Sequence, residues 1–270
     1  GSMAWDMDGK KNNINDNDKR IGILKAKALK MIDRLAALDF NIHVSVVDFS
    51  DNANNPGDFK NLNVTSELTQ VKTAINELNA DGATNTGDGI RRAYYRLKNK
   101  ADSLPSESKI TQHMMILVDG ETNTETRKIT SRGWLLVYFV TGEHQTYEDG
   151  NTNNNVVVGN RRTVSVGDNN NGYVTFIGDN LIKQYKYTIE GEQKQAINTF
   201  VIGFSNLTKD HNSLQAIGEA VNGKQFEHSD NTMKPYILAT DADELDFAFE
   251  QFEAEVENSL WVITRPQLWP

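Results

Sequence analysis

Two stretches of the chain carry oxygen-bearing side chains in a pattern that could hold a metal ion. The first is the glycine-rich turn 80–90 (ADGATNTGDGI), and the second is 114–120 (MMILVDG), an apolar run that ends on a carboxylate. Glycine lets the backbone adopt positive φ angles and come close to a bound ion. Thr84 and Asp119 offer the hard oxygen ligands that Mg²⁺ or Mn²⁺ prefers, and Ca²⁺ is a further candidate. The pattern predicts a cation site where a helix begins and a strand ends.

The same residues also allow a purely structural interpretation, in which Thr84 is a turn residue and Asp119 caps the turn after its strand. Asp48, Ser50 and Asp88 are weaker candidates for the site, because turns and helix caps explain them equally well. Residues 6–10 (DMDGK) are similar to the start of a calcium loop but lack its later carboxylates. We expect that segment to be a solvated loop.

Other chemistry finds no support in the sequence. There are no cysteines, which excludes disulfides, thiol catalysis and Cys-ligated zinc. The histidines form no HExxH motif, and no GxSxG elbow, Walker loop or GxGxxG after a strand occurs. We therefore expect a protein that is not an enzyme, with His43 and His113 as packing residues within strands.

Composition narrows the class of partner. The 270 residues carry a formal net charge of −9, so broad binding to nucleic acid or to anionic membranes is disfavoured. A hydrophobic fraction of 38% is enough for a sizeable core, and no run of 18 apolar residues occurs. These values predict one large globular domain, with or without an insertion.

The elements that must position Thr84 and Asp119 follow from hydrophobic periodicity. The predicted order is helix, strand, helix, helix, strand, over residues 21–38, 40–49, 66–78, 87–104 and 110–118. Asp18 and Ser66 are the expected N-caps of the first two helices. This order predicts an α/β fold with a doubly wound, mostly parallel sheet flanked by helices, in which ligands bind at the carboxyl ends of strands. Asp119 falls at such an end.

Residues 127–194 depart from this alternation of helices and strands, since they are rich in β-branched residues, aromatic residues and Asn-Gly turns. We expect a β-rich insertion. Its aromatic side chains form either a recognition surface or the insertion's own core; they are Trp134, Tyr138, Phe139, Tyr173, Tyr185 and Tyr187.

The core pattern then resumes with a strand at 196–204, a helix at 213–221 and a short edge strand at 236–239. A final helix begins near Asp241, with one apolar face made of Leu245, Ala248, Phe249, Phe252 and Val256. The expected division is a domain over 1–258 and an extended segment over 259–270 that could belong to a neighbouring module.

Four segments together resemble the von Willebrand factor type A (vWA, integrin I-like) domain: 82–87 (GATNTG), 116–120 (ILVDG), 201–204 (VIGF) and 236–245 (YILATDADEL). The resemblance spans about residues 20–258 apart from the insertion. It implies the vWA/Rossmann-like fold and a metal-ion-dependent adhesion site (MIDAS). That site takes ligands from a DxSxS strand end, a threonine before a helix and an aspartate after a central strand.

The second and third of these ligands correspond to Thr84 and Asp119. The first motif commonly reads DxSGSM, and the chain opens with Gly1-Ser2-Met3, so Ser2 corresponds to its last serine; a cloning remnant is the alternative interpretation. The strand before it and its aspartate do not appear in the sequence. We expect a longer protein, or a preceding segment, to supply them.

The resemblance implies a metal-dependent adhesion module on a bacterial cell surface or pilus. Its expected partners are host extracellular-matrix or plasma glycoproteins, which would supply a carboxylate to the metal, and other pilus subunits. The Asn-rich loops and the trailing segment 260–266 (LWVITRP) resemble those of Gram-positive pilus-associated adhesins, in particular adhesive type IV pilins. Two alternatives remain open: an intracellular assembly factor that works with an AAA-type ATPase, and a structural pilus or wall module with an inactive site.

Overall fold

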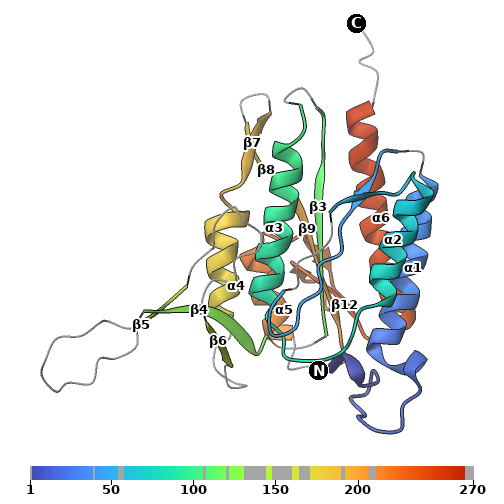
Figure 1. Ribbon diagram of the computed structural model, residues 1–270, viewed down its shortest axis with the longest axis vertical. Helices are drawn as coiled ribbons and strands as arrows, with labels where there is room; N and C mark the ends of the chain where they lie inside the picture. Colours follow the sequence, from blue (N-terminus) through green and yellow to red (C-terminus); the bar gives the residue numbers. More distant parts are fainter. Residues whose placement is uncertain are drawn as a thin grey trace, which may run out of the picture.

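A three-stranded parallel sheet lies at the centre of the computed structural model, which describes residues 2–38, 40–53, 58–105, 108–119, 122–130, 144–147, 160–163, 171–189, 192–206 and 211–264 (Figure 1). Its strands are β3 (Gln112–Val118), β9 (Ile197–Phe204) and β12 (Ile237–Ala239), in the order β12-β9-β3. All three run parallel, with Ile116 opposite Val201. The predicted doubly wound α/β fold is confirmed.

Helices cover both faces of this sheet (Figure 1). On one face lie α1 (Arg20–Ala37), α2 (Thr65–Asn76) and α6 (Ala242–Thr264). On the other lie α3 (Thr86–Asp102), α4 (Gly172–Ile177) and α5 (His211–Ala220). Because β3 is covered on both sides, its residues alternate between two hydrophobic clusters rather than between core and solvent.

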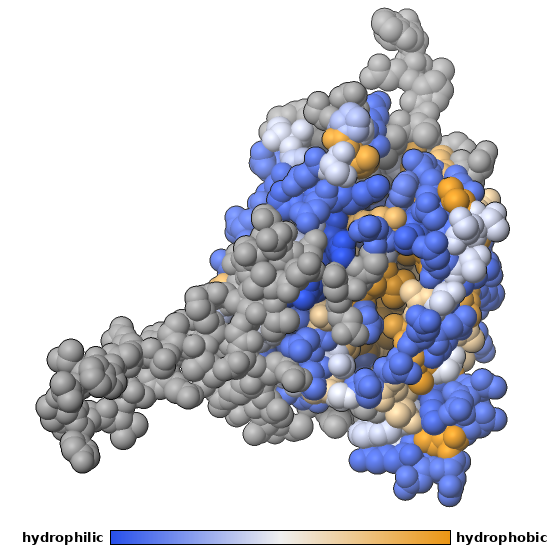
Figure 2. Space-filling model, in the orientation of Figure 1, coloured by the Kyte–Doolittle hydropathy of each residue, from blue (hydrophilic) through white to orange (hydrophobic). Residues whose placement is uncertain are grey.

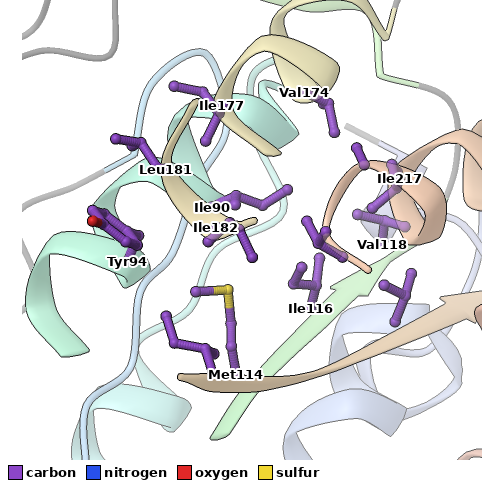
Figure 3. Packing of buried hydrophobic residues seen from close by; sticks show 14 of the residues in the cluster. Ile90, Tyr94, Met114, Ile116, Val118, Val174, Ile177, Leu181, Ile182 and Ile217 are labelled. Atoms are coloured by element: carbon purple, nitrogen blue, oxygen red, sulfur yellow. The ribbon is translucent and has the colours of Figure 1, made fainter. Parts of the chain in front are cut away.

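The core between the sheet and the α3–α4–α5 layer is closely packed. Figure 3 shows Met114, Ile116 and Val118 of β3 pointing at side chains from α3, α4 and α5. Ile90, Ile177 and Ile217, one from each helix, are at most 1% exposed. The helix that carries the Thr84 turn is thereby fixed against the strand that carries Asp119.

The first helix begins where its periodicity predicts, but its N-cap differs. Asp18 belongs to a short 3-10 helix, η2 (Asp16–Asp18), and Lys19 takes the cap position of α1 without a side-chain hydrogen bond. The cap of α2 is likewise Val64 rather than Ser66. Both predictions were wrong by one or two residues, since tertiary packing sets these helix ends.

The predicted strand 40–49 is only partly formed. Two residues, β1 (His43–Val44), pair antiparallel with β2 (Lys60–Asn61), and Phe49 forms one isolated bridge to Ala53. Its side chains still alternate into the core: Ile42, Val44 and Val46 pack beside α1, while Phe49 packs beside α3. The segment is therefore largely half-buried, and within the described residues it pairs with another segment only at His43–Val44 and at Phe49.

The expected β-rich insertion contains strands and also a helix. β4 (Thr124–Thr130) pairs antiparallel with β5 (His144–Thr146) and β6 (Asn160–Thr163), and β7 (Lys186–Ile189) with β8 (Glu192–Gln195).

Residues 172–182, expected to be β-rich, instead form α4 and a π-helical turn, η3 (Gly178–Ile182). The spacing of the buried Val174, Ile177 and Leu181 is helical, which explains the correction. Tyr173 is 1% exposed, and Tyr185 is partly buried against the same core. Tyr187 is 43% exposed, whereas Trp134, Tyr138 and Phe139 lie outside the described residues.

The apolar face predicted for the last helix is confirmed, since all five of its residues are buried. Asp241 accepts hydrogen bonds from the backbone N–H groups of Asp243 and Glu244, a side-chain cap at the start of α6. The expectation of an extended segment from residue 259 was wrong as far as Thr264, because Leu260 continues the helical spacing one turn after Val256.

The remaining described elements are η1 (Ser2–Ala4) and a small hairpin of β10 (Phe226–Glu227) and β11 (Met233–Lys234). None of the helices in the described part of the chain combines the length and apolarity that a membrane span requires.

One edge of the sheet borders an apolar groove. In the described residues β3 pairs with β9 alone, and a cavity of about 660 Å³ runs between its other edge and the segment 41–49. Met31 and Ile32 of α1, Ile90 of α3 and Phe249 of α6 line it. Figure 2 shows hydrophobic atoms in a hollow at this place, to the right of β3 in the orientation of Figure 1.

Candidate functional site

The three predicted ligand residues, Ser2, Thr84 and Asp119, all lie along this groove. Asp119 follows the last residue of β3 and is 5% exposed, and Ser2 donates a hydrogen bond to its carboxylate. The N-terminal segment thus contacts the end of the central strand, and the turn before α3 lines the same groove.

Hydrogen bonds hold the Thr84 turn to the loop that follows Asp119. The backbone N–H of Thr84 donates to Oδ1 of Asn123 at 2.7 Å, and the carbonyl of Thr84 accepts the N–H groups of Asn123 and Thr124. One turn further, the hydroxyl of Thr122 donates to that of Thr86 at 2.9 Å. The backbone groups of Thr84 make these contacts, so the turn is fixed without using the Thr84 hydroxyl.

A glycine permits the conformation of this turn. Gly82 has φ of +69°, in the left-handed region that favours glycine, and a Cβ there would lie 3.0 Å from Cβ of Ser50. Asn85 then caps α3 by accepting the N–H of Asp88, and its own N–H donates to the Ser50 carbonyl. The segment 41–50 therefore ends at the same side of the sheet as β3.

An arginine that the sequence did not suggest lies against Asp119. The guanidinium of Arg20 is fully buried, and its Nη1 lies 3.0 Å from the Asp119 carbonyl oxygen and 3.5 Å from Oδ2. Burial raises the pKa of the Asp119 carboxyl, while the Ser2 hydrogen bond and the Arg20 charge oppose the rise. A buried carboxylate of this kind is stabilised by any cation placed beside it.

The side chains of Ser2, Thr84 and Asp119 are of the chemical type that binds a hard divalent cation. Two hydroxyls and one carboxylate are oxygen ligands, and Arg20 already supplies a stand-in positive charge at Asp119. A single carboxylate predicts weak affinity. Consistent with this, no cluster of three or more His, Asp or Glu side chains suited to a metal occurs among the described residues.

Asp88 and Asp6, two of the other carboxylates considered, have structural roles. Asp88 is fully buried and pairs with Arg91 at 2.7 Å, while its second oxygen accepts the N–H of Ala53. Asp6 closes its own turn, because its Oδ1 accepts the N–H of Lys10 at 2.7 Å. Asp48 lines the groove along with the three ligand residues.

The sequence alone missed two residues of the site, Arg20 and Asn123. Arg20 reads as an ordinary first residue of an amphipathic helix, and its partner is 99 positions away. Asn123 follows Asp119 closely enough to be suspected, since an asparagine after a strand often fixes a turn. Only the fold shows that it binds the Thr84 loop.

Comparison with known proteins places this architecture in a family. The family profile described as the von Willebrand factor type A domain matches residues 17–158, just over half of the chain. A search of curated protein sequences finds no match.

Several solved structures share the fold. The PilB minor pilin from Streptococcus sanguinis is 23% identical with a TM-score of 0.67, over 98% of this chain and 61% of that one. The vWF domain of the type V pili tip protein Mfa5 from Porphyromonas gingivalis is 11% identical with a TM-score of 0.54, covering 95% and 93% of the two chains. The pilus adhesin SpaC from Lactobacillus rhamnosus GG is 12% identical with a TM-score of 0.52, over 88% and 28%.

The chain thus spans less than two thirds of the length of PilB. At these identities the likeness concerns the fold. The match to the family profile, the parallel sheet with helices on both faces, and the meeting of the Thr84 turn with Asp119 agree with one another. The chain belongs to the von Willebrand factor type A domain family.

Proposed function

We propose that the chain is a non-enzymatic adhesion module that binds a partner protein through a divalent cation held by Ser2, Thr84 and Asp119. The observation that supports the proposal is the hydrogen bond from Ser2 to Asp119 just after β3, with Thr84 lining the same groove. Mg²⁺ or Mn²⁺, when bound there, supplies a positive charge with an open coordination position for a partner's carboxylate.

Each residue has a definite part in this proposal. Asp119 provides the charge that attracts the cation, and its burial strengthens that attraction relative to water. Thr84 provides a hydroxyl from a turn whose backbone is fixed by Asn123. Ser2 donates a hydrogen bond to Asp119, which orients the carboxylate toward the other ligands.

The proposed setting is a bacterial surface or pilus, with extracellular-matrix or plasma glycoproteins of a host, and other pilus subunits, as partners. Its support is the family membership together with the names of the structural relatives, which are a minor pilin, a pilus adhesin and a pilus tip protein. The net charge of −9 favours a protein partner over nucleic acid.

Binding to immobilised matrix and plasma proteins tests the proposal. The chain is assayed in Mg²⁺ or Mn²⁺, in chelator, and as the variants Asp119→Ala and Thr84→Ala. Asp81→Ala is the matched control, because Asp81 is an exposed carboxylate on the same rim of the groove. We expect binding to be lost in chelator and in both site variants and retained in the control. Binding that survives chelator would contradict the metal bridge.

A further inference from the structure

Arg20 is in direct contact with the proposed cation ligand Asp119. We propose that Arg20 is a built-in counter-cation of Asp119, which competes with the divalent cation for that carboxylate and couples cation binding to release of the N-terminal loop 5–19. The inference rests on the proposed function, since it concerns the same carboxylate.

Charge balance supports this role. The Arg20 side chain is 0% exposed and that of Asp119 is 5% exposed, so each charge is removed from water. In the described part of the chain, Asp119 is the acidic side chain within ion-pair distance of the guanidinium. A buried charge that loses its partner is strongly destabilising, so Arg20 and Asp119 depend on each other.

The place of Arg20 in its helix points the same way. Arg20 is the first residue of α1, where the helix dipole is positive and disfavours a cation. The helix therefore gives no reason for a buried arginine at this position. The direct contact with Asp119, 99 residues further along the chain, provides that reason.

The same guanidinium also holds the N-terminal loop. Its Nε donates to the carbonyl of Asp6 at 3.1 Å and its Nη2 to that of Met7 at 3.4 Å. The backbone N–H of Arg20 donates to the carbonyl of Trp5 at 2.9 Å. The planar guanidinium of Arg20 thus connects residues 6 and 7 to Asp119, while the Arg20 backbone holds Trp5.

A divalent cation on Asp119 and the guanidinium beside it repel each other in a buried setting, where electrostatic interactions are strong. The favourable arrangement with a cation bound therefore has Arg20 moved away from Asp119. Its bonds to Asp6 and Met7 are then lost with it. Because such coupling is reciprocal, a loop closed by Arg20 weakens cation binding by the same factor.

Calorimetric titration with Mn²⁺ alone tests the competition in the parent chain, in Arg20→Gln and in Arg34→Gln. Arg34 is the matched control, because it lies on the same helix and its side chain pairs with Glu253 and Asp246 of α6, away from the groove. We expect Arg20→Gln to bind Mn²⁺ about 10-fold more tightly than the parent, within the usual range of coupling between sites. Arg34→Gln should bind as the parent does.

Hydrogen exchange provides a second measurement that does not depend on affinity. Saturation with Mn²⁺ should speed amide exchange in the peptide 5–12 of the parent, where the N–H groups of Gly9 and Lys10 are hydrogen-bonded to Asp6. In Arg20→Gln the peptide should exchange fast with or without Mn²⁺. Arg20→Lys covers the case in which Arg20→Gln does not fold. Lysine keeps the positive charge but loses the planar guanidinium. The Mn²⁺ affinity of this variant should therefore lie between those of the parent and of Arg20→Gln.

The outcomes separate the two proposals. If the parent binds Mn²⁺ and Arg20→Gln binds no more tightly, the competition is wrong and the proposed function stands. An equal gain in Arg34→Gln would also overturn the competition, since it would reflect general loosening of α1. Absence of Mn²⁺ binding in the parent and in both Arg20 variants would overturn the proposed cation site itself.

Discussion

Thr84 and Asp119 could be recognised from residue type and spacing, because a glycine-rich turn before a helix and an apolar run ending in a carboxylate are local patterns. Ser2 depended on the family resemblance. Arg20 could not be found this way, since its role depends on a contact across 99 residues and opposes the usual charge preference of a helix start.

The conformation of Gly82 gives a prediction at this scale. Gly82→Ala should lower the free energy of unfolding by about 1–2 kcal/mol, because alanine is strained at positive φ. The added Cβ would also contact Ser50 at 3.0 Å. Urea denaturation measures the change.

Gly9→Ala is its control, since Gly9 also has positive φ, at +81°, but a Cβ there meets nothing within 4 Å. Gly9→Ala should lower the free energy of unfolding by less than Gly82→Ala does. Equal costs would mean that contact with Ser50 contributes nothing to the Thr84 turn.

At the scale of the elements, periodicity predicted the type of most helices and strands. The structure corrected the predictions for segments whose conformation depends on packing against distant parts of the chain. Residues 172–182 have β-type composition yet form α4 and η3, because their apolar spacing matches the space beside α3. Residues 40–49 have the alternation of a strand, but a strand also needs a neighbour.

His113 of β3 makes the contact between strand and α6 sensitive to pH. Burial is the main reason that its pKa is lowered to about 4 from an ordinary value of 6.5, and its Nε2 lies 3.1 Å from Oγ of Ser259. The unfolded chain therefore binds the proton more readily. The neutral, buried His113 ring therefore contributes stability that is present above pH 6.5. This contribution, up to about 3 kcal/mol, is lost as the pH falls through 4.

His113→Gln removes the titrating ring, so its urea midpoint should depend less on pH between 6.5 and 4 than that of the parent. Ser259→Ala removes the hydrogen bond and keeps the ring, and should retain the parent's dependence. Identical pH profiles for His113→Gln and the parent would contradict this account of β3 and α6.

A charged network joins α1 to α6. Arg34 donates to both oxygens of Glu253, at 2.6 and 2.5 Å, and to Asp246 at 3.1 Å. Such bidentate pairs are the stronger class of surface ion pair, so Arg34→Met should cost about 1–2 kcal/mol, and less in high salt.

Lys72→Met is the comparison for this network, since Lys72 makes one exposed pair with Asp33. It should change the free energy of unfolding by less than about 0.5 kcal/mol. Equal effects of the two substitutions in chemical denaturation would show that the α1–α6 network adds no stability.

For the whole molecule, the sequence predicted the α/β class, whereas the groove beside β3 could not be predicted from it. Side chains of β3 and of the segment 41–49 pack into both hydrophobic clusters, and the space between these two segments is apolar. Ser2 lies at the groove end where a strand parallel to β3 would finish.

Joining a seven-residue strand of alternating Val and Thr ahead of residue 1, matching β3 in length, should therefore raise the urea midpoint. It should also slow amide exchange along the edge of β3 that does not face β9. A control extension of the same length with proline at its centre cannot pair and should do neither. If both extensions behave alike, the groove does not receive a strand at this position.

The central claim is that Ser2, Thr84 and Asp119 together hold a divalent cation, and anomalous diffraction from crystals soaked in Mn²⁺ tests it most directly. The account predicts one anomalous peak at about 2.1 Å from the side-chain oxygens of Thr84 and Asp119, with Ser2 as a third ligand. It also predicts that the Arg20 guanidinium no longer contacts Asp119 in those crystals. A saturating soak that leaves no peak between these three residues, with Arg20 still bound to Asp119, would contradict it.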